Sequence, residues 1–265
     1  MVEFTLKDRY TYEDLLEIMR ILRSPERCVW DREQGHKSIR RSFIEETYEA
    51  VEAIDNEDPV LLQEELGDVL LQVVFHAQIE AEAGRFTMDD VADGVCKKMI
   101  YRHPHVFGTA EAKTSEDVLA NWDALKQKEK HQKSTTDALE SVARSLPGLI
   151  RAEKVQHKAA KVGFDWDDVS GALEKVREET AEVARAVAGD GDPSEELGDL
   201  LFAAVNVARF LKTDPEEAIS RTTDKFIRRF AQVEQAARDA GKDLADMSLA
   251  EMDALWDAAK QKEHT

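Results

Sequence analysis

The segment EETAEVARAVAGDGDPSEELGDLLFAAVNVARFL, residues 178–211, reads as two helices joined by a turn that holds glycines and a proline. Glu179 and Glu182 are three residues apart on the first predicted helix, so they lie about one turn apart on one face. Glu196 and Asp199 repeat that spacing on the second predicted helix. Four carboxylates brought together in this way repel one another unless a cation lies between them.

Hard divalent cations with oxygen ligands suit such a cluster, and Mg2+ suits it best. The alternative is a solvated acidic surface, because the chain has 55 acidic residues among its 265. Two observations favour the metal. The first is that apolar side chains surround the second helix in nearly every direction after Asp199, which predicts a buried helix with an acidic first turn.

The second observation is that the whole arrangement occurs twice. Residues 45–79 read EETYEAVEAIDNEDPVLLQEELGDVLLQVVFHAQI, which repeats the acidic pairs as Glu46 with Glu49 and Glu65 with Asp68. Further landmarks recur in the same order, including VWD at 29–31 with DWD at 165–167 and NWDALKQKE at 121–129 with LWDAAKQKE at 255–263. The sequence therefore predicts a duplicated domain, with a first copy at 1–130, a linker at 131–144 and a second copy at 145–265.

Composition limits the class of protein. A length of 265 residues fits two domains, and only 12 Gly and 6 Pro favour long helices over a strand-and-turn architecture. The net charge of −19 argues against nucleic acid or an anionic membrane as a partner. Two cysteines are too few for a disulfide framework, the N-terminus does not resemble a signal peptide, and no apolar run is long enough for a membrane span. We expect a cytoplasmic protein.

Basic residues follow the second acidic pair. Lys225 and Arg229 are four residues apart on a predicted helix, with Arg228 beside them, and this arrangement suits a polyphosphate. Lys175 precedes Glu179 by one turn and can reach the same site. Each of these residues alone could instead pair with a surface carboxylate, but their joint appearance with the acidic cluster favours a phosphate ligand.

Taken together, these motifs resemble the MazG nucleoside triphosphate pyrophosphohydrolases. The resemblance covers nearly the whole chain and rests on EExxE followed by ExxD in both copies, VWDREQ, RHPHVF at 102–107, SLPGL at 145–149, VGFDW at 162–166 and KFIRRF at 225–230. It implies hydrolysis of NTP or dNTP to the monophosphate and pyrophosphate with Mg2+, for which Mn2+ can substitute. It also implies an all-α fold whose four-helix-bundle core is completed by homodimerisation.

The resemblance also assigns roles to residues. The implied metal ligands are Glu179, Glu182, Glu196 and Asp199 in the second copy, and Glu46, Glu49, Glu65 and Asp68 in the first. The implied nucleotide contacts are Lys175, Glu178, Lys225, Arg228, Arg229 and Trp256. Either Glu178 or Glu179 would orient or deprotonate the attacking water, and Lys225 and Arg229 would act on the phosphates.

The two copies differ in their basic residues. Ser42 stands in the first copy where the second has Lys175, and Tyr101 stands where the second has Arg228. The first copy therefore keeps the acidic residues but loses part of the basic set. Our hypothesis is that the second copy performs most of the catalysis.

Other functions remain open at this point. A di-iron carboxylate bundle also places acids on facing helices, but it uses Glu-x-x-His, which neither copy has at the required place. A non-enzymatic acidic helical interaction protein does not explain why acidic pairs begin two apolar helices in both copies. Within the resembled superfamily, a narrower substrate such as dUTP or phosphoribosyl-ATP is an alternative.

Overall fold

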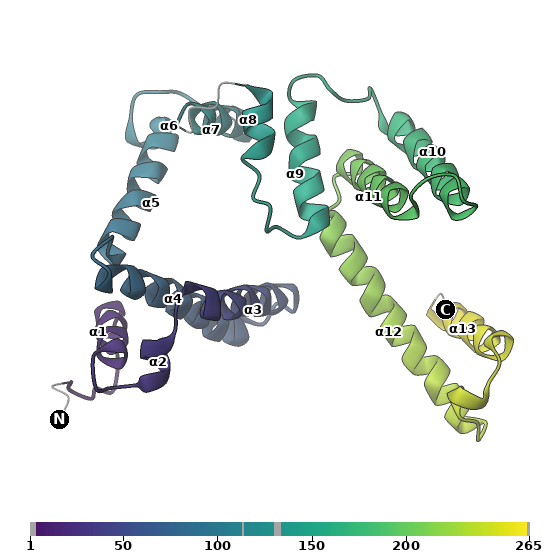
Figure 1. Ribbon diagram of the computed structural model, residues 1–265, viewed down its shortest axis with the longest axis horizontal. Coiled ribbons are helices and arrows are strands. Elements are labelled where there is room, and N and C mark those ends of the chain that lie inside the picture. Colours follow the sequence, from purple (N-terminus) through teal and green to yellow (C-terminus); the bar gives the residue numbers. More distant parts are fainter. Residues whose placement is uncertain (1–3, 113, 130–133, 264–265) are drawn as a thin grey trace. The chain divides into compact units, whose positions relative to one another are not determined.

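A computed structural model describes residues 4–112, 114–129 and 134–263 of the chain. Within these residues all regular secondary structure is helical, which confirms the predicted all-α fold class (Figure 1). The chain divides into two compact units, Met1–Lys126 and Gln127–Thr265. Each unit holds one of the two predicted acidic helix pairs. None of the described helices combines the length and the apolar composition that crossing a membrane requires.

The helices of the first unit, in chain order, are α1 (Tyr12–Arg23), α2 (Val29–Glu33), α3 (His36–Asp55), α4 (Pro59–Glu82), α5 (Met88–Arg102), α6 (Pro104–Phe107) and α7 (Ser115–Glu129), whose last residues pass the unit boundary. The second unit contains α8 (Thr135–Glu140), α9 (Gly148–Ala160), α10 (Val169–Val187), α11 (Pro193–Phe210), α12 (Pro215–Asp239), the short 3-10 helix η1 (Leu244–Asp246) and α13 (Leu249–Glu263).

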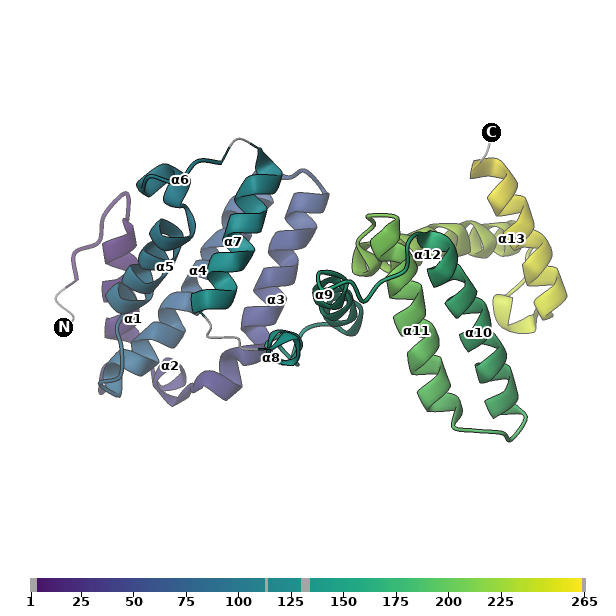
Figure 2. The same cartoon turned by 90° about the horizontal axis from the view of Figure 1, so that it is seen from above.

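Two helical hairpins position the acidic residues. α3 packs against α4 in the first unit, and α10 packs against α11 in the second (Figures 1 and 2). At the second turn Gly189 and Gly191 adopt φ values of +102° and +121°, a backbone region that favours glycine. Asp192 then caps α11, because its side chain accepts a hydrogen bond from Ser194 N at 2.9 Å, and Pro193 occupies the first turn. The short turn brings the end of α10 back beside the start of α11.

The core of the first unit forms where α1 packs on the α3–α4 hairpin. Met19, Ile39, Val74 and Phe75 make up this core, and each is at most 4% exposed. Arg23 closes one side of the core, since its guanidinium lies 5.2 Å from the centre of the Phe75 ring and pairs with Glu82 at 2.9 Å. In the second unit α9 packs on α11 and α12.

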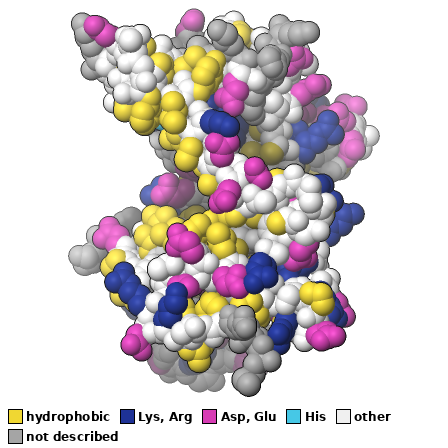
Figure 3. Space-filling model, turned by 90° about the vertical axis from the view of Figure 1, so that its left-hand side faces the viewer, with side chains coloured by type: hydrophobic (Ala, Val, Ile, Leu, Met, Phe, Trp, Pro, Cys, Tyr) yellow, Lys and Arg dark blue, Asp and Glu magenta, His cyan; other side chains and the backbone are white. Residues whose placement is uncertain are grey.

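The α11 helix is not buried on all sides, and our expectation of a buried helix is wrong for the single chain. Leu197, Leu201 and Phe202 are 49%, 50% and 44% exposed. In the first unit Leu66 on α4 and Tyr48 on α3 are similarly exposed. Apolar side chains therefore lie open at the surface among acidic ones, as the space-filling view shows (Figure 3). An apolar pattern shows that a surface needs cover, but the covering surface can belong to another chain.

The segment predicted as a linker, residues 131–144, has structure of its own. Residues 131–133 lie outside the described residues, but Ser134 caps α8 and this helix packs against α9. Ala138 and Val142 are 8% and 7% exposed. The second unit therefore begins before the predicted boundary at residue 145.

Candidate functional site

The hairpin of α10 and α11 brings the acidic residues of the second copy together. One oxygen from each of Glu179, Glu196 and Asp199 lies within 4.8 Å of the others. Glu178, Glu179 and Glu182 form a second such group along α10. Glu179 belongs to both groups, so it lies at the centre of the acidic cluster. The i, i+3 spacing in the sequence accounts for this arrangement, because the tight turn aligns the two acidic faces.

Glu179 is buried, with 3% of its surface exposed. Its Oε1 atom lies 2.5 Å from Lys175 Nζ, and its Oε2 atom has no hydrogen-bond partner among the described residues. A buried carboxylate oxygen without a partner is unfavourable, so such an atom indicates that a cation or a donor is to be bound there. The donor set around it consists of carboxylate oxygens, which fits Mg2+ or Mn2+.

The electrostatics of the cluster favour a cation for the same reason. Burial raises the pKa of Glu196, and the charges of Glu182, Glu179 and Asp199 raise it further. Hydrogen bonds to Glu179 and Glu178 raise the pKa of Lys175 above its ordinary value, so this lysine stays charged. Arg185 pairs with Glu182 at 2.9 Å, so Lys175 and Arg185 together still do not balance the charges of Glu179, Glu182, Glu196 and Asp199. A divalent cation would relieve the repulsion that remains.

The first copy forms a similar acidic cluster, with one group of three carboxylates among the described residues where the second copy has two such groups. Oxygens of Glu46, Glu49 and Glu65 lie within 4.8 Å of one another. The pKa of Glu46 is raised mainly by burial and then by a hydrogen bond and charge from Glu49, with a smaller effect from Asp68. Burial, Glu49 and Asp68 also raise the pKa of Glu65. Ser42 stands at the position of Lys175, so the described contacts of this cluster are acid with acid.

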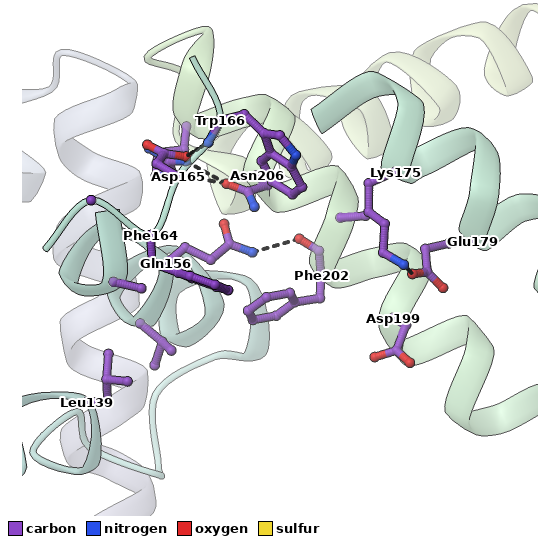
Figure 4. A pocket seen from close by; sticks show the side chains of 15 residues that line it. Leu139, Gln156, Phe164, Asp165, Trp166, Lys175, Glu179, Asp199, Phe202 and Asn206 are labelled. Atoms are coloured by element: carbon purple, nitrogen blue, oxygen red, sulfur yellow. Dashed lines mark hydrogen bonds and ion pairs between the residues drawn. The ribbon is translucent and has the colours of Figure 1, made fainter. Parts of the chain in front are cut away.

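A cavity of about 760 Å³ opens beside the acidic cluster of the second copy (Figure 4). Lys175, Glu179 and Asp199 line one end of it, and Phe164, Trp166 and Phe202 contribute aromatic rings to the rest. Residues from α8, α9, α10, α11 and the connection before α10 form its wall. A volume of this size and a lining of apolar walls with few polar groups are typical of small-molecule sites.

Several polar residues of this cavity were not predicted as site residues. Arg209 makes a bidentate ion pair with Asp165, in which one contact is 2.8 Å long, and it also donates to Asn206 Oδ1 at 2.8 and 3.1 Å. Gln156 and Asn206 are buried in the wall. The signal in the sequence is the pair of polar residues, Asn206 and Arg209, in the part of α11 after Asp199, which is otherwise apolar.

One glycine permits this geometry. A Cβ atom on Gly171 would lie 2.3 Å from the Trp166 ring, so only glycine lets that ring pack against the first turns of α10. Trp166 also lies next to Asp165, whose side chain accepts from Trp166 N at 3.0 Å. The DWD motif therefore positions an aromatic ring and a carboxylate together at the cavity.

The predicted basic residues lie elsewhere in the second unit. Lys225, Arg228 and Arg229 are on α12 and Trp256 is on α13, and none of the four lines the cavity. Arg229 lies over the Trp256 ring at 5.9 Å from its centre. Phe226 lies 5.0 Å from the same ring, and the α12–α13 contact therefore forms a separate basic and aromatic group. Lys175 is the predicted basic residue that does line the cavity.

The comparison with a family model and the comparison with individual proteins indicate the same family. The family described as "MazG nucleotide pyrophosphohydrolase domain" matches residues 34–107 and again residues 168–234, which confirms the duplication. The chain is 43% identical over 257 residues to the nucleoside triphosphate pyrophosphohydrolase/pyrophosphatase MazG of Thermotoga maritima, covering 96% of this chain and 97% of that protein. It is 44% identical over 254 residues to the nucleoside triphosphate pyrophosphohydrolase of Escherichia coli K12, covering 94% and 97%.

A third relative has a different organisation. The uncharacterised protein YabN of Bacillus subtilis is 50% identical over 257 residues, which cover 96% of this chain but 52% of that protein. The same pair of domains thus also occurs as part of a longer chain. From its two domain matches and its full-length relatives, the chain belongs to the MazG nucleotide pyrophosphohydrolase family and is a hydrolase.

Proposed function

We propose that this protein hydrolyses nucleoside triphosphates, including deoxynucleoside triphosphates, to the monophosphate and pyrophosphate in the cavity of the second copy. The Thermotoga and Escherichia relatives are named for this activity. The observation that carries the proposal is the buried Oε2 of Glu179, which has no described partner and belongs to a carboxylate clustered with those of Glu196 and Asp199 beside a 760 Å³ cavity.

The proposed cofactor is Mg2+, with Mn2+ as a substitute. Glu179, Glu182, Glu196 and Asp199 would hold it, because they supply the oxygen ligands that these ions prefer. Mg2+ bound there supplies a Lewis acid that polarises the phosphoryl oxygens.

The residues around the cluster have distinct tasks in this proposal. Lys175 holds Glu178 Oε1 at 2.9 Å and Glu179 Oε1 at 2.5 Å, so it orients both carboxylates. The Glu178 side chain is 58% exposed, which leaves it open to water, and we assign it the role of orienting or deprotonating the attacking water. Lys225, Arg228, Arg229 and Trp256 are proposed as further nucleotide contacts, as the family resemblance implies.

We also propose that the protein is a homodimer. The support is the apolar surface that each hairpin leaves open, including Leu197 and Leu201 on α11 and Tyr48 on α3. A second copy of the chain can cover these surfaces and so complete a four-helix bundle. Its role would be to remove nucleotides from the cytoplasmic pool. The free thiols of Cys28 and Cys96 fit a reducing compartment.

Product identification tests the proposal directly. Purified protein is incubated with Mg2+ and a panel of NTPs and dNTPs that includes dUTP, together with phosphoribosyl-ATP, and products are separated by anion-exchange chromatography. We expect monophosphate and pyrophosphate from several nucleotides. Turnover of dUTP or phosphoribosyl-ATP alone would support the narrower alternative. Diphosphate with orthophosphate, or no turnover of any compound, would contradict the proposal.

A further inference from the structure

Gln156 lies in the wall of the cavity with 6% of its surface exposed. Its Nε2 atom donates to the backbone oxygen of Phe202 at 2.7 Å. A carbonyl oxygen can only accept, so this contact fixes which side of the amide is nitrogen. The Oε1 atom is then the free end, and it has no hydrogen-bond partner among the described residues. Figure 4 shows this oxygen directed toward Asn206.

The amide orientation of Asn206 is also fixed, but here, among the described contacts, the oxygen is the paired atom and the nitrogen is not. Its Oδ1 accepts from Arg209 Nη2 at 2.8 Å and from Arg209 Nε at 3.1 Å. A guanidinium group can only donate, so the NH2 group of Asn206 lies on the side away from Arg209. Asp165 holds Arg209 through both carboxylate oxygens. The wall of the cavity therefore holds an acceptor on Gln156 that has no described partner and an oriented donor on Asn206, with the Trp166 and Phe202 rings beside them (Figure 4).

The first copy shows that the fold itself does not need these polar groups. Phe75 stands at the position of Asn206, at the same offset that relates Glu65 to Glu196. It is 4% exposed and belongs to the core with Met19 and Val74. An apolar ring thus satisfies the packing of this helix position. An amide buried in its place is unfavourable unless its hydrogen bonds are completed, and Arg209 completes them only for the Oδ1 atom of Asn206.

We propose that Gln156 and Asn206 recognise the base of the nucleotide, stacked on Trp166, and that Asp165 and Arg209 are the positioning residues for this contact. A nucleobase is flat and offers an N–H donor and an acceptor on one edge, which are the partners that Gln156 Oε1 and Asn206 Nδ2 need. The triphosphate then extends to the acidic end of the same cavity. This inference rests on the proposed function, because it takes a nucleotide as the substrate. It assigns base recognition to the second copy and to residues outside the acidic motifs.

Two substitutions test the contact with little disturbance of packing. Asn206→Asp keeps an oxygen toward Arg209 but replaces the cavity-facing NH2 group with a second acceptor. Gln156→Met keeps the size of the side chain and removes the acceptor. Gln235→Leu is the matched control, since Gln235 is an exposed amide on α12 whose described contact is with Asp239. Thermal unfolding of each variant checks that it folds.

The kinetic readout separates base recognition from chemistry. Steady-state rates are measured for ATP, GTP, CTP and UTP and for ribose 5-triphosphate, which lacks a base. We expect both variants to lower kcat/KM for the four nucleotides by about 10- to 100-fold, mainly through KM, and to leave ribose 5-triphosphate unchanged. Arg209→Gln should show the same base-dependent loss, because its effect passes through Asn206.

Equal losses on the nucleotides and on ribose 5-triphosphate would overturn the inference, as would an unchanged KM for every nucleotide. Calorimetric titration with α,β-methylene analogues of the four nucleotides keeps the test independent of turnover. If the wild-type protein hydrolyses no nucleotide, the proposed function fails. A weaker affinity of Asn206→Asp and Gln156→Met for the analogues would still support base recognition, and an unchanged affinity would exclude it.

Discussion

Lys175 Nζ lies 2.5 Å from Glu179 Oε1, one helical turn along α10, while Glu179 Oε2 has no hydrogen-bond partner among the described residues. One oxygen of this carboxylate is therefore neutralised within the chain, and the other is buried without a described partner in a carboxylate that belongs to the same cluster as Glu196 and Asp199. The two oxygens of Glu179 therefore have different roles. Lys175 holds the side chain in place, and the second oxygen is left for a ligand.

Glu179→Gln tests whether this carboxylate is essential. The amide keeps the shape of the side chain but loses the charge, so we expect kcat/KM for ATP to fall by about 100-fold or more, as measured by pyrophosphate release. The matched control is Glu46→Gln, which makes the same change at the corresponding position of the first copy. We expect Glu46→Gln to retain most of the activity. Equal losses in the two variants would show that both copies are needed for catalysis.

Lys175→Met tests the charge balance at the site. The substitution leaves Glu179 buried without its counter-charge, so we expect the Tm of the metal-free protein to fall by about 2–4 °C, the effect of roughly 1 kcal/mol in a chain of this size. The folded pKa of Lys175 is raised, so its contribution is complete below the ordinary lysine pKa of 10.5. The difference from wild type should therefore stay constant between pH 6 and pH 9. Saturating Mg2+ should reduce this difference in Tm. A difference in Tm that Mg2+ leaves unchanged would show that Lys175 and the metal site do not influence each other.

Leu201→Glu tests the proposed homodimer. Leu201 is 50% exposed on α11, near Leu197, and a charge placed in a dimer interface of this kind is strongly unfavourable. We expect the wild-type protein to sediment as a dimer and Leu201→Glu to sediment as a monomer in analytical ultracentrifugation. Leu249→Glu is the control, because Leu249 is 80% exposed at the start of α13. If the wild-type protein sediments as a monomer, the proposal of a homodimer is wrong.

Glu80→Gln tests a buried polar group in the first unit. Glu80 accepts from Arg85 and contacts His36 Nε2 at 2.5 Å, and His36 Nδ1 lies 2.7 Å from His76 Nδ1. The Arg85 hydrogen bond lowers the pKa of Glu80 to about 2, with a smaller effect from His36. The stability that this carboxylate contributes is present above its unfolded pKa of 4.5 and is lost as pH falls toward 2.

We therefore expect Glu80→Gln to unfold at a lower temperature than wild type at pH 7. The difference should shrink below about pH 4.5, where the unfolded carboxyl becomes protonated. Thermal unfolding followed by circular dichroism over this pH range measures the effect. A gap that grows as pH falls from 4.5 toward 2 would contradict the assigned role of Glu80.

Much of the fold and of the acidic site was predictable from sequence because both depend on local geometry. The spacing of Glu179 with Glu182 and of Glu196 with Asp199 determines a helix face, and Gly189, Gly191 and Pro193 determine where the chain turns. These features need no knowledge of distant residues. The duplication was equally visible, because it depends on the order of motifs along the chain.

The cavity could not be predicted in the same way. Gln156 and Asn206 are 50 positions apart and face each other because α9 packs on α11, which is a contact between distant segments. The exposure of Leu201 could not be predicted from the sequence either. The spacing of apolar residues along a helix is the same whether the helix is covered by its own chain or by another chain. Lys225 and Arg229 lie on α12 and do not line the cavity, and Arg229 lies over the Trp256 ring of α13; their role in nucleotide binding stays a prediction.

The sequence by itself thus determined the helices, the repeat, the acidic pairs and the family, since each of these follows from short-range spacing. The tertiary structure decided which oxygen of Glu179 is paired and which is free, and it decided which side of each amide faces the cavity. The physical reason is that hydrogen-bond partners from other helices select these orientations, and the spacing of residues along one helix carries no information about them.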